Sequence, residues 1–363
     1  MPSLDNNTKA FLELVRAGLW EKEARFSQFC EVDYGEIMSL AEKQSVDGLV
    51  TAGLEHVTDV KVPQEVLLQF IGQSLQLEQR NTAMNKFIAE MIEKMRQEGI
   101  YTLLVKGQGI AQCYERPLWR VSGDVDLLLS NDNYEKAKDF LLPLSSSQKR
   151  EEQYSKHLGM SIGEWYVEIH GSLRSGLSES VDREIDRAQR DVFYGGNVRS
   201  WENGNVQVFL PGVDEDVFFV FTHFIKHFYK EVLGLRQVCD WCRLLWTYRD
   251  KVDVRLLETR LRKAGLMNEW KGFAAVAVEY LGMPAEAMPL LDVKGKMDDG
   301  RWKIDRRWNR KAEKIVRLIL SGYSGNKYRD TLRIMRIYPW NTLKFLPGIL
   351  WHVNWLKIKE RLS

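Results

Sequence analysis

The chain has 363 residues, 44% of them hydrophobic and 28% charged, a balance that excludes a disordered protein and allows two or three structural units. The formal net charge of +2 conceals an excess of +12 in residues 301–363, which hold 16 Lys or Arg against 4 Asp or Glu. The rest of the chain therefore carries 2 minus 12, or −10. We expect this segment to meet an anionic partner: nucleic acid, lipid headgroups or the protein's own acidic body.

The first residues lack the basic stretch and apolar run of a signal peptide, and no uncharged run approaches the length of a membrane span. We therefore expect a cytoplasmic protein. Its four cysteines, Cys30, Cys113, Cys239 and Cys242, are too few and too scattered for a disulfide framework, so we expect free thiols.

Residues 1–99 are predicted to form an N-terminal helical region. Apolar residues at helical spacing within 8–57 indicate short helices. One long helix is predicted from Pro63, a residue suited to a first helical turn, to Gly99, a residue suited to a helix end. Its apolar stripe spans residues 84–95.

Residues 100–212 are predicted to form a compact mixed α/β unit. Apolar runs of strand length occur at 101–105 (YTLLV), 124–129 (DVDLLL), 165–169 (WYVEI) and 206–209 (VQVF). Helical spacing at 134–142 separates the second run from the third. These runs predict a small mixed sheet at the centre of the chain.

The chain is predicted to be helical again after Pro211, where acidic residues at 214–216 suit a first helical turn. We divide this part into a helical region, 213–291, that closes a cleft, and a basic, Trp-rich helical segment, 292–363. The latter begins with a predicted linker at 292–300 (DVKGKMDDG). The expected fold class is α+β, a small mixed sheet flanked by helical regions on both sides.

Asp124 and Asp126 are the central candidates for chemistry. With 50 Asp and Glu in the chain, roughly seven acidic pairs at this spacing are expected by chance. This pair opens an apolar strand, where alternate side chains share a face and lie about 6.6 Å apart along the backbone, so both can ligate a shared metal site. The alternative places both in solvent or pairs them with Arg120. Glu168, flanked by apolar residues on a later strand, can supply a third carboxylate.

A second candidate feature is the turn that follows the first strand. Lys106 and Gly107 end the strand, and Gln108 and Gly109 open a predicted helix. Exposed N–H groups at a helix start attract anions, glycine lets a phosphate approach the backbone, and the lysine adds a positive charge. These four residues are therefore candidate nucleotide-binding residues.

The order of these pieces is similar to that of a known family. The segment LLVKGQGIAQCYERPLWRVSGDVDLLL has a Lys-Gly turn, a tyrosine-containing helix, an arginine and then Asp-x-Asp heading an apolar strand, with Lys106, Gly107, Arg120, Asp124 and Asp126 in those places. AEKQSVDGLV, VEIHGSL, THFIKHF and LRQVCDWCRLL are further matches. The chain resembles the bacterial family of uncharacterised nucleotidyltransferases in the polymerase-beta-like superfamily, over about residues 35–245.

The resemblance implies a nucleotidyltransferase core that moves a nucleoside monophosphate from an NTP, with ATP favoured, to an acceptor that is a small molecule, a glycan precursor or a protein. It implies a two-metal mechanism with Mg²⁺ or Mn²⁺ on Asp124, Asp126 and Glu168. Arg120 is expected to meet triphosphate oxygens, with an ion pair as the alternative. Where the superfamily usually has Gly-Ser or Gly-Gly, this chain has Gln108 after the glycine, so a non-catalytic nucleotide-binding or scaffold protein is the second hypothesis.

Several other residues are candidates for the same cleft. His170 shares a strand face with Glu168 and can contact nucleotide or metal, or make only a hydrogen bond. His227, Arg236 and Asp240 fall in the downstream family segments and can line the cleft, although nothing in their spacing requires it.

A zinc site is a rival interpretation of His223 with His227 and of Cys239 with Cys242. The cysteine pair lies in a continuous helical pattern without Gly or Pro to form a knuckle, and the histidine pair lacks the glutamate of a zinc protease. We expect packed core residues instead.

Residues 339–358 combine tryptophan, phenylalanine and aliphatic residues with lysines, a pattern typical of an interfacial helix on an anionic membrane. Pro347 and Lys344 exclude a span. We favour a helix that packs on the protein's own core, so the membrane-peripheral location stays the alternative. Stacking on nucleic acid is the third option, and no recognised nucleic-acid module supports it.

Overall fold

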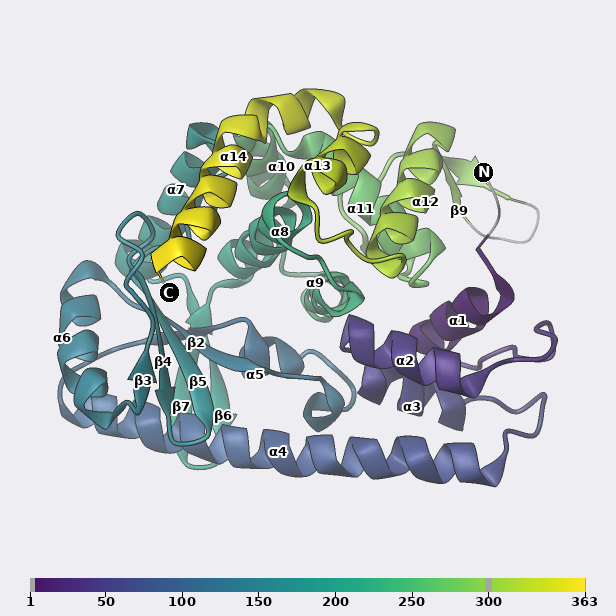
Figure 1. Ribbon diagram of the computed structural model, residues 1–363, viewed down its shortest axis with the longest axis horizontal. Coiled ribbons are helices and arrows are strands. Elements are labelled where there is room, and N and C mark those ends of the chain that lie inside the picture. Colours follow the sequence, from purple (N-terminus) through teal and green to yellow (C-terminus); the bar gives the residue numbers. More distant parts are fainter. Residues whose placement is uncertain (1–3, 298–301, 363) are drawn as a thin grey trace.

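The structure is a computed structural model that describes residues 4–297 and 302–362, with side chains described up to residue 350 apart from the same gap. A five-stranded sheet lies at one end with α6 (Asn131–Leu141) beside it, one long helix runs along an edge, and most of the other helices fill the other end and the opposite side (Figure 1). The predicted α+β class is confirmed.

Three short helices open the chain: α1 (Asn6–Trp20), α2 (Tyr34–Gln44) and α3 (Asp47–Glu55). α1 and α3 cross closely, because a Cβ atom on Gly18 or Gly53 would lie only about 2 Å from a backbone oxygen of the other helix. The short helices predicted for this region are therefore present and packed against one another.

The predicted long helix is α4 (Gln64–Gln97). Its C-terminal half lies along the sheet and buries five apolar side chains there: Met84, Ile88, Met91, Ile92 and Met95. Its N-terminal half packs on α3. Figure 1 shows α4 running beneath both the sheet and the N-terminal helices, so this one element connects the two ends of the molecule.

The five-stranded sheet has the order β1-β2-β5-β4-β3. The strands are β1 (Leu103–Val105), β2 (Asp124–Leu128), β3 (Ser147–Gln148), β4 (His157–Ile162) and β5 (Trp165–His170). β2 and β5 run parallel, and the other neighbours are antiparallel. Three of the predicted strands, β1, β2 and β5, lie side by side in this sheet, whereas β3 and β4 were not predicted.

The connections inside this part are short helices: α5 (Gly107–Ala111), η1 (Pro117–Trp119), α6 (Asn131–Leu141) and η2 (Leu142–Leu144). One face of the sheet is apolar and packs on α4 and α6. The other face carries the acidic residues of β2 and β5 and is turned toward later helices. Alternation along the strands thus separates the core from the site.

The run at 206–209 is a strand, but it does not join the five-stranded sheet. It belongs to β7 (Val206–Pro211), which forms a separate hairpin with β6 (Val198–Asn203) against α4 and β1. The unpredicted helix α7 (Glu179–Gly195) precedes this hairpin.

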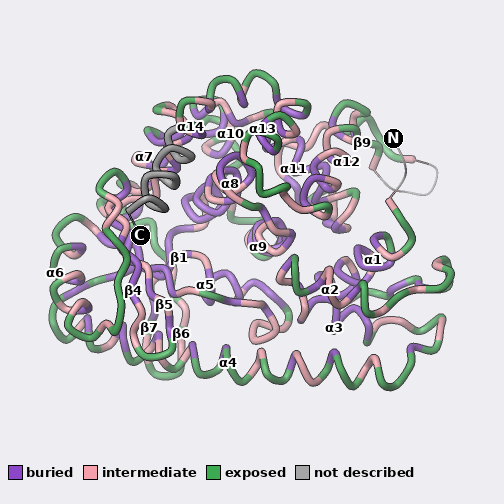
Figure 2. The backbone as a smooth tube through the Cα atoms, viewed as in Figure 1, coloured by how far each residue is buried: buried purple, intermediate pink, exposed green. Residues whose placement is uncertain are grey.

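Four helices follow: α8 (Val213–Lys230), α9 (Leu235–Thr247), α10 (Val254–Ala264) and α11 (Met267–Glu279). Figure 2 shows α8 and α9 buried at the centre of the molecule. Their aromatic side chains meet in a cluster of Phe221, Phe224, Trp241, Trp270 and Phe273. The apolar core here also includes residues of α1 and α3, so the N-terminal helices and the helices after residue 213 share one core.

The described part of the predicted linker at 292–300 contains a strand. A short helix, η3 (Ala285–Ala287), precedes a hairpin of β8 (Val293–Lys296) and β9 (Trp302–Ile304), so residues 293–296 are strand and not linker. The polar composition of this segment indicated a linker, but the segment forms a strand because it pairs with β9, the strand that contains Trp302. Residues 298–300 of the predicted linker lie outside the described residues.

The chain ends with α12 (Arg306–Leu320), α13 (Lys327–Met335) and α14 (Pro339–Leu362). α14 packs on the protein: Phe345 is buried, with its ring centroid 5.0 Å from that of Tyr229, whereas Trp340 is 81% exposed. Trp351 and Trp355, which contributed to the membrane interpretation, lie outside the described side chains. No helix in the described part of the chain is long and apolar enough to cross a bilayer. Contact with an anionic membrane stays a prediction.

Gly348 provides a test of this docking. A Cβ atom there would lie 2.2 Å from the backbone oxygen of Gly176, so Gly348→Ala is expected to lower the free energy of unfolding by about 1–3 kcal/mol, measured by urea denaturation. Gly72, inside α4, is the control because a Cβ atom there would have no neighbour within 4 Å. Gly72→Ala should raise stability by about 1 kcal/mol. Equal stability of Gly348→Ala and the unchanged protein would argue against the docked position of α14.

Candidate active site

Three carboxylates converge on the polar face of the sheet. β2 and β5 are parallel, and their register places Asp126 directly beside Glu168, with Asp124 two residues earlier on the same face of β2. Carboxylate oxygens of the three residues lie within 4.8 Å of one another. Asp126 is 2% exposed, so the group has little water to offset its mutual repulsion.

Lys106 supplies a positive charge to this group. Its Nζ donates to Oδ1 of Asp126 over 2.7 Å. The lysine lies at the turn between β1 and α5, where the backbone has φ angles of +58° at Lys106 and +42° at Gly107. Burial lowers the pKa of the ammonium, but the surrounding carboxylates outweigh burial and raise it, so Lys106 stays charged at neutral pH.

The carboxylates differ in their electrostatic environment. The charge on Asp126, followed by burial, raises the pKa of Asp124 above its usual range. Burial opposes ionisation of Asp126 too, but Lys106 and His170 outweigh it and hold the pKa of Asp126 well below its usual range. Asp124 is thus the acid whose negative charge the surrounding protein compensates least.

Two histidines lie beside the carboxylates. His157 of β4 and His170 of β5 are opposite each other in the sheet, and their rings stack with centroids 4.6 Å apart and planes 1° apart. Nε2 of His170 lies 2.7 Å from Oδ1 of Asp126, and Nε2 of His157 lies 3.0 Å from Oε2 of Glu168. Burial lowers the pKa of His170, so this imidazole is neutral at pH 7.

A cavity of about 300 Å³ lies above this face. Its opposite wall comes from α8 and α9 and includes His223, His227, Arg236 and Asp240. The Nε2 atoms of the two histidines are 3.1 Å apart. Nη1 of Arg236 donates to a backbone oxygen over 2.6 Å, whereas its Nε is buried without a hydrogen-bond partner.

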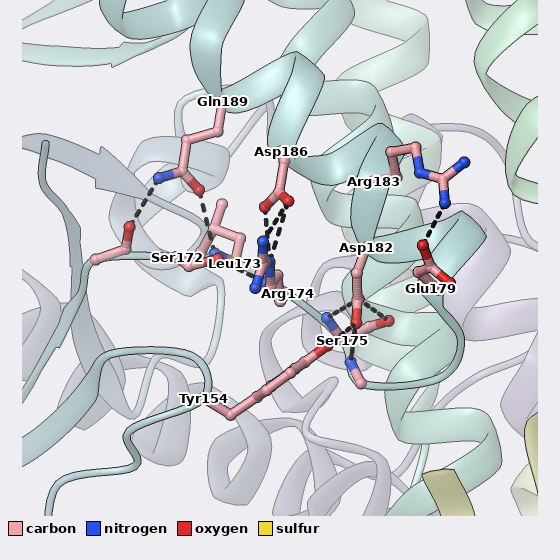
Figure 3. A network of polar contacts seen from close by, with 12 residues as sticks. Tyr154, Ser172, Leu173, Arg174, Ser175, Glu179, Asp182, Arg183, Asp186 and Gln189 are labelled. Atoms are coloured by element: carbon pink, nitrogen blue, oxygen red, sulfur yellow. Dashed lines mark hydrogen bonds and ion pairs between the residues drawn. The ribbon is translucent and has the colours of Figure 1, made fainter. Parts of the chain in front are cut away.

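The loop after β5 forms a further wall of the cavity and is fixed to α7 (Figure 3). Asp182 of α7 accepts the backbone N–H of Ser175 over 2.7 Å and the hydroxyl of Tyr154 over 2.8 Å. Arg174 forms an ion pair with Asp186 at 2.6 Å. A second, more open cavity of about 490 Å³ lies on the outer side of this loop. The network holds the partition between the two cavities in place.

Comparison with known proteins places this geometry in a family. A family model described as uncharacterised nucleotidyltransferase matches residues 31–282. The chain belongs to this uncharacterised nucleotidyltransferase family. The matched segment includes every element that lines the cavity of about 300 Å³, and leaves out α1 and α12–α14. No curated protein and no solved structure matches.

Arg120 makes other contacts than the predicted ones. Its Nε and Nη2 atoms each donate to an oxygen of Asp240 over 2.7 Å, and Nη1 donates to Oγ of Ser122 over 2.8 Å. The guanidinium donors that were expected to meet triphosphate oxygens therefore bind a carboxylate of α9, which is the ion-pair alternative. Asp240 also accepts the hydroxyl of Tyr114 over 2.7 Å, so the arrangement joins the β1–β2 connection to α9.

Gln108 and Gly109 point away from the cavity. The amide of Gln108 donates to Oδ1 of Asn81 and to the sulfur of Met84 on α4, and the side chain is 1% exposed. Gly109 allows close packing, because a Cβ atom there would lie 2.8 Å from a methyl group of Leu210. Neither residue lines the cavity, unlike Lys106 and Gly107, so nucleotide contact by the backbone of Gln108 and Gly109 stays a prediction.

The rival zinc site is not assembled. Cys239 and Cys242 are fully buried in α9. Among the described residues, the donor groups close enough to hold a metal ion are His157 with Glu168 and His170, and Asp124 with Asp126 and Glu168; neither group includes a cysteine.

Thiol labelling checks this placement. Cys30 is exposed, whereas Cys113 and the two cysteines of α9 are buried. Burial raises the pKa of Cys113 to about 11 and that of Cys239 well above its usual value. We expect one of the four thiols to react rapidly with Ellman's reagent in the native protein and all four after unfolding. A native count of two or more would contradict the buried positions.

Sequence reasoning missed His157 and gave Arg236 no assigned role. The segment HLGMSI alternates polar or small residues with apolar ones, a pattern that could have predicted β4. The pairing of β4 with β5 brings His157 beside Glu168. No pattern within either segment indicates this pairing, so the position of His157 could not be predicted from local sequence. The absence of a partner for Nε of Arg236 likewise results from the packing of α9 and could not be predicted from local sequence.

Proposed function

We propose that this protein transfers a nucleoside monophosphate from an NTP to an acceptor, at the cavity bounded by β2, β5, α8 and α9. The observation that carries the proposal is the convergence of Asp124, Asp126 and Glu168 on one sheet face within the family-matched segment. A nucleotidyltransferase needs closely spaced carboxylates to hold divalent ions against phosphates, and the arrangement of these three residues supports that use.

The three carboxylates fit a hard divalent ion, because oxygen ligands are those that Mg²⁺ and Mn²⁺ prefer. Asp126 and Glu168 have pKa values below their usual range, so both offer charged oxygens at neutral pH. When bound, such ions supply charge neutralisation on the triphosphate and lower the pKa of the attacking hydroxyl. We assign the ions to Asp124, Asp126 and Glu168, with ATP as the favoured nucleotide.

Two cations are suited to the triphosphate. Lys106 is charged and already lies at the carboxylates. Arg236 is the better candidate for the role first expected of Arg120, because the residue lines the same cavity and its buried Nε has no partner, whereas the Arg120 guanidinium is engaged with Asp240. A phosphate oxygen accepting from Nε would satisfy this buried donor.

The acceptor hydroxyl needs a place beside the phosphates. The outer cavity of about 490 Å³ shares Ser172 and Arg174 with the inner one. We propose that the acceptor, a small molecule, glycan precursor or protein, approaches from that side. Glu168 is the third metal ligand in this proposal, and its carboxylate is the group that we assign to receive a proton from that hydroxyl.

The test is transfer from labelled nucleotide. The protein is incubated with Mg²⁺ or Mn²⁺ and each α-labelled NTP, alone and with cell extract, and both pyrophosphate release and label on an acceptor are measured. Asp124→Asn is the inactive variant, and Asp132→Asn, an exposed acid at the start of α6, is the matched control. We expect release by the unchanged protein and by Asp132→Asn, and at least about 100-fold less by Asp124→Asn.

Equal release by all three proteins would refute the enzyme assignment. A non-catalytic nucleotide-binding protein has a different signature: metal-dependent thermal stabilisation by NTP without any release of pyrophosphate.

A further inference from the structure

The two stacked histidines and Glu168 form a second group of donor atoms beside the three carboxylates. Nε2 of His157, Nε2 of His170 and a carboxylate oxygen of Glu168 lie within 4.8 Å of one another. All three residues come from the paired strands β4 and β5, with His157 directly opposite His170. Strands hold side chains more rigidly than loops do, so these donors have fixed relative positions.

We propose that His157, Glu168 and His170 form a metal position of their own, for a divalent transition ion such as Co²⁺, Cu²⁺ or Zn²⁺. Glu168 is then shared with the neighbouring all-carboxylate position. The part of this ion in the reaction rests on the proposed function, but its binding does not.

The distances agree with coordination. Nε2 of His157 lies 3.0 Å and Nε2 of His170 lies 3.7 Å from Oε2 of Glu168. Two ligand atoms that are each about 2.1 Å from a tetrahedral ion lie about 3.4 Å apart. The observed separations fall on either side of this value. The two rings are parallel in this structure, so one imidazole must rotate, and Nε2 of His170 must exchange its hydrogen bond with Asp126 for the ion, before both ring nitrogens face the same ion.

An unused hydrogen-bonding group favours metal binding over a purely positioning role. Nε2 of His157 is buried and makes no aligned hydrogen bond, although Glu168 is close. His170, in contrast, is already satisfied by Asp126. A buried polar atom without a partner lowers stability, so such atoms are rare unless a ligand uses them. His157 can orient Glu168 from 3.0 Å, but its buried Nε2 still lacks an aligned hydrogen bond, and a metal ion would use this atom.

The other side of the His157 ring also suits a ligand. Its Nδ1 lies 3.9 Å from Oε2 of Glu152, and Ser155 donates to the same oxygen over 2.8 Å. A carboxylate on the far nitrogen is the usual means of orienting a metal-bound imidazole and of raising its basicity. The 3.9 Å separation is too long for a hydrogen bond, so Glu152 must move closer to His157 to orient a metal-bound ring.

This donor set differs in selectivity from the carboxylate position. Two imidazoles and one carboxylate leave a fourth coordination position open, for water or for a phosphate oxygen. Imidazole nitrogen suits the transition ions, whereas Mg²⁺ prefers oxygen ligands in an octahedral arrangement. Excess Mg²⁺ should fill the carboxylate position and leave the histidine position to the transition ion.

Pulsed electron paramagnetic resonance tests the proposal on the unchanged protein. Cu²⁺ is added at one equivalent in the presence of excess Mg²⁺, and modulation from imidazole nitrogen is recorded. We expect clear nitrogen modulation from imidazole. Cu²⁺ that shows oxygen ligands alone would overturn the proposal, whatever the folding of any variant.

Direct Co²⁺ binding provides the second test, by the visible absorption of the ion and by calorimetry. His157→Asn should bind Co²⁺ at least about 100-fold more weakly than the unchanged protein. His56→Asn, which removes a histidine of the N-terminal helices paired with Glu21, should bind equally well. Thermal unfolding without metal shows whether each variant is folded. Equal Co²⁺ affinity of folded His157→Asn and the unchanged protein overturns the proposal.

Asp124→Asn separates this inference from the proposed function. It removes a ligand of the carboxylate position only, so it should lose pyrophosphate release and keep both the nitrogen modulation and Co²⁺ binding. Loss of the nitrogen modulation in folded Asp124→Asn would contradict a separate histidine position. If the unchanged protein binds Co²⁺ through nitrogen but releases no pyrophosphate with any NTP, the metal position stands and the proposed function fails.

Discussion

Asp124→Asn is expected to abolish nucleotidyl transfer while stabilising the metal-free protein. The charge on Asp126, followed by burial, raises the pKa of Asp124, and a carboxyl group whose pKa rises on folding destabilises the folded state once it is ionised. Removing that charge should raise the free energy of unfolding near neutral pH, on the order of 1 kcal/mol. The gain should vanish below about pH 3.9, where Asp124 is protonated in both states.

Asp126→Asn is the contrasting variant. Asp126 accepts from Lys106 and from His170, both over 2.7 Å, so its replacement leaves a partly buried ammonium without its closest counter-charge. We expect the free energy of unfolding to fall by about 2 kcal/mol. Breaking an isolated buried ion pair costs roughly 3–5 kcal/mol, and the cost here is smaller because Asp124 and Glu168 remain close to the ammonium. Urea denaturation in EDTA measures both variants. Similar stabilities of the two would show that these carboxylates are electrostatically equivalent.

Asp240→Ala is expected to have the largest effect on stability, a loss of about 3–5 kcal/mol. It leaves the guanidinium of Arg120, whose side chain is 4% exposed, without its bidentate partner, and it removes the acceptor of the Tyr114 hydroxyl. Urea denaturation measures the loss. The double variant Arg120→Met with Asp240→Leu removes both charges and should recover much of it, since no buried charge is left unpaired.

The surface pair of Arg262 and Glu258, whose side chains are 68% and 38% exposed, provides the control. Glu258→Ala should change stability by less than about 1 kcal/mol. If Asp240→Ala keeps full stability but loses transfer activity, the pairing is not structural and Arg120 acts on the phosphates after all.

Elements of the fold could be predicted where the spacing of apolar residues within one segment indicates a helix or a strand. The stripe of α4 and the apolar runs of β2 and β5 identified the elements that carry the carboxylates. β4 was missed because its site-facing residues are polar or small, which weakens the apolar signal of a strand. The hairpin of β7 was assigned to the wrong sheet because a strand pattern does not specify its partner.

Side-chain direction limited the prediction of the site. Arg120 is close in sequence to Asp124, which favoured a phosphate contact, but its partner Asp240 lies 120 residues later. The direction of the Gln108 side chain is set by its hydrogen bond to Asn81 of α4, which lies 27 residues earlier in the chain. Contacts between distant parts of the chain determine where the side chains of Arg120 and Gln108 point, and such contacts cannot be predicted from residue spacing or composition.

The common core of the N-terminal and C-terminal helices bears on how the chain can be shortened. The indole of Trp20 in α1 donates to the backbone oxygen of Leu281, and α12 lies against α11. A truncated chain limited to the family-matched residues 31–282 would lose α1, α12 and α14 and expose the apolar surfaces that they cover. The boundary of family similarity is therefore not a folding boundary, and such a fragment should aggregate where the full chain stays dispersed.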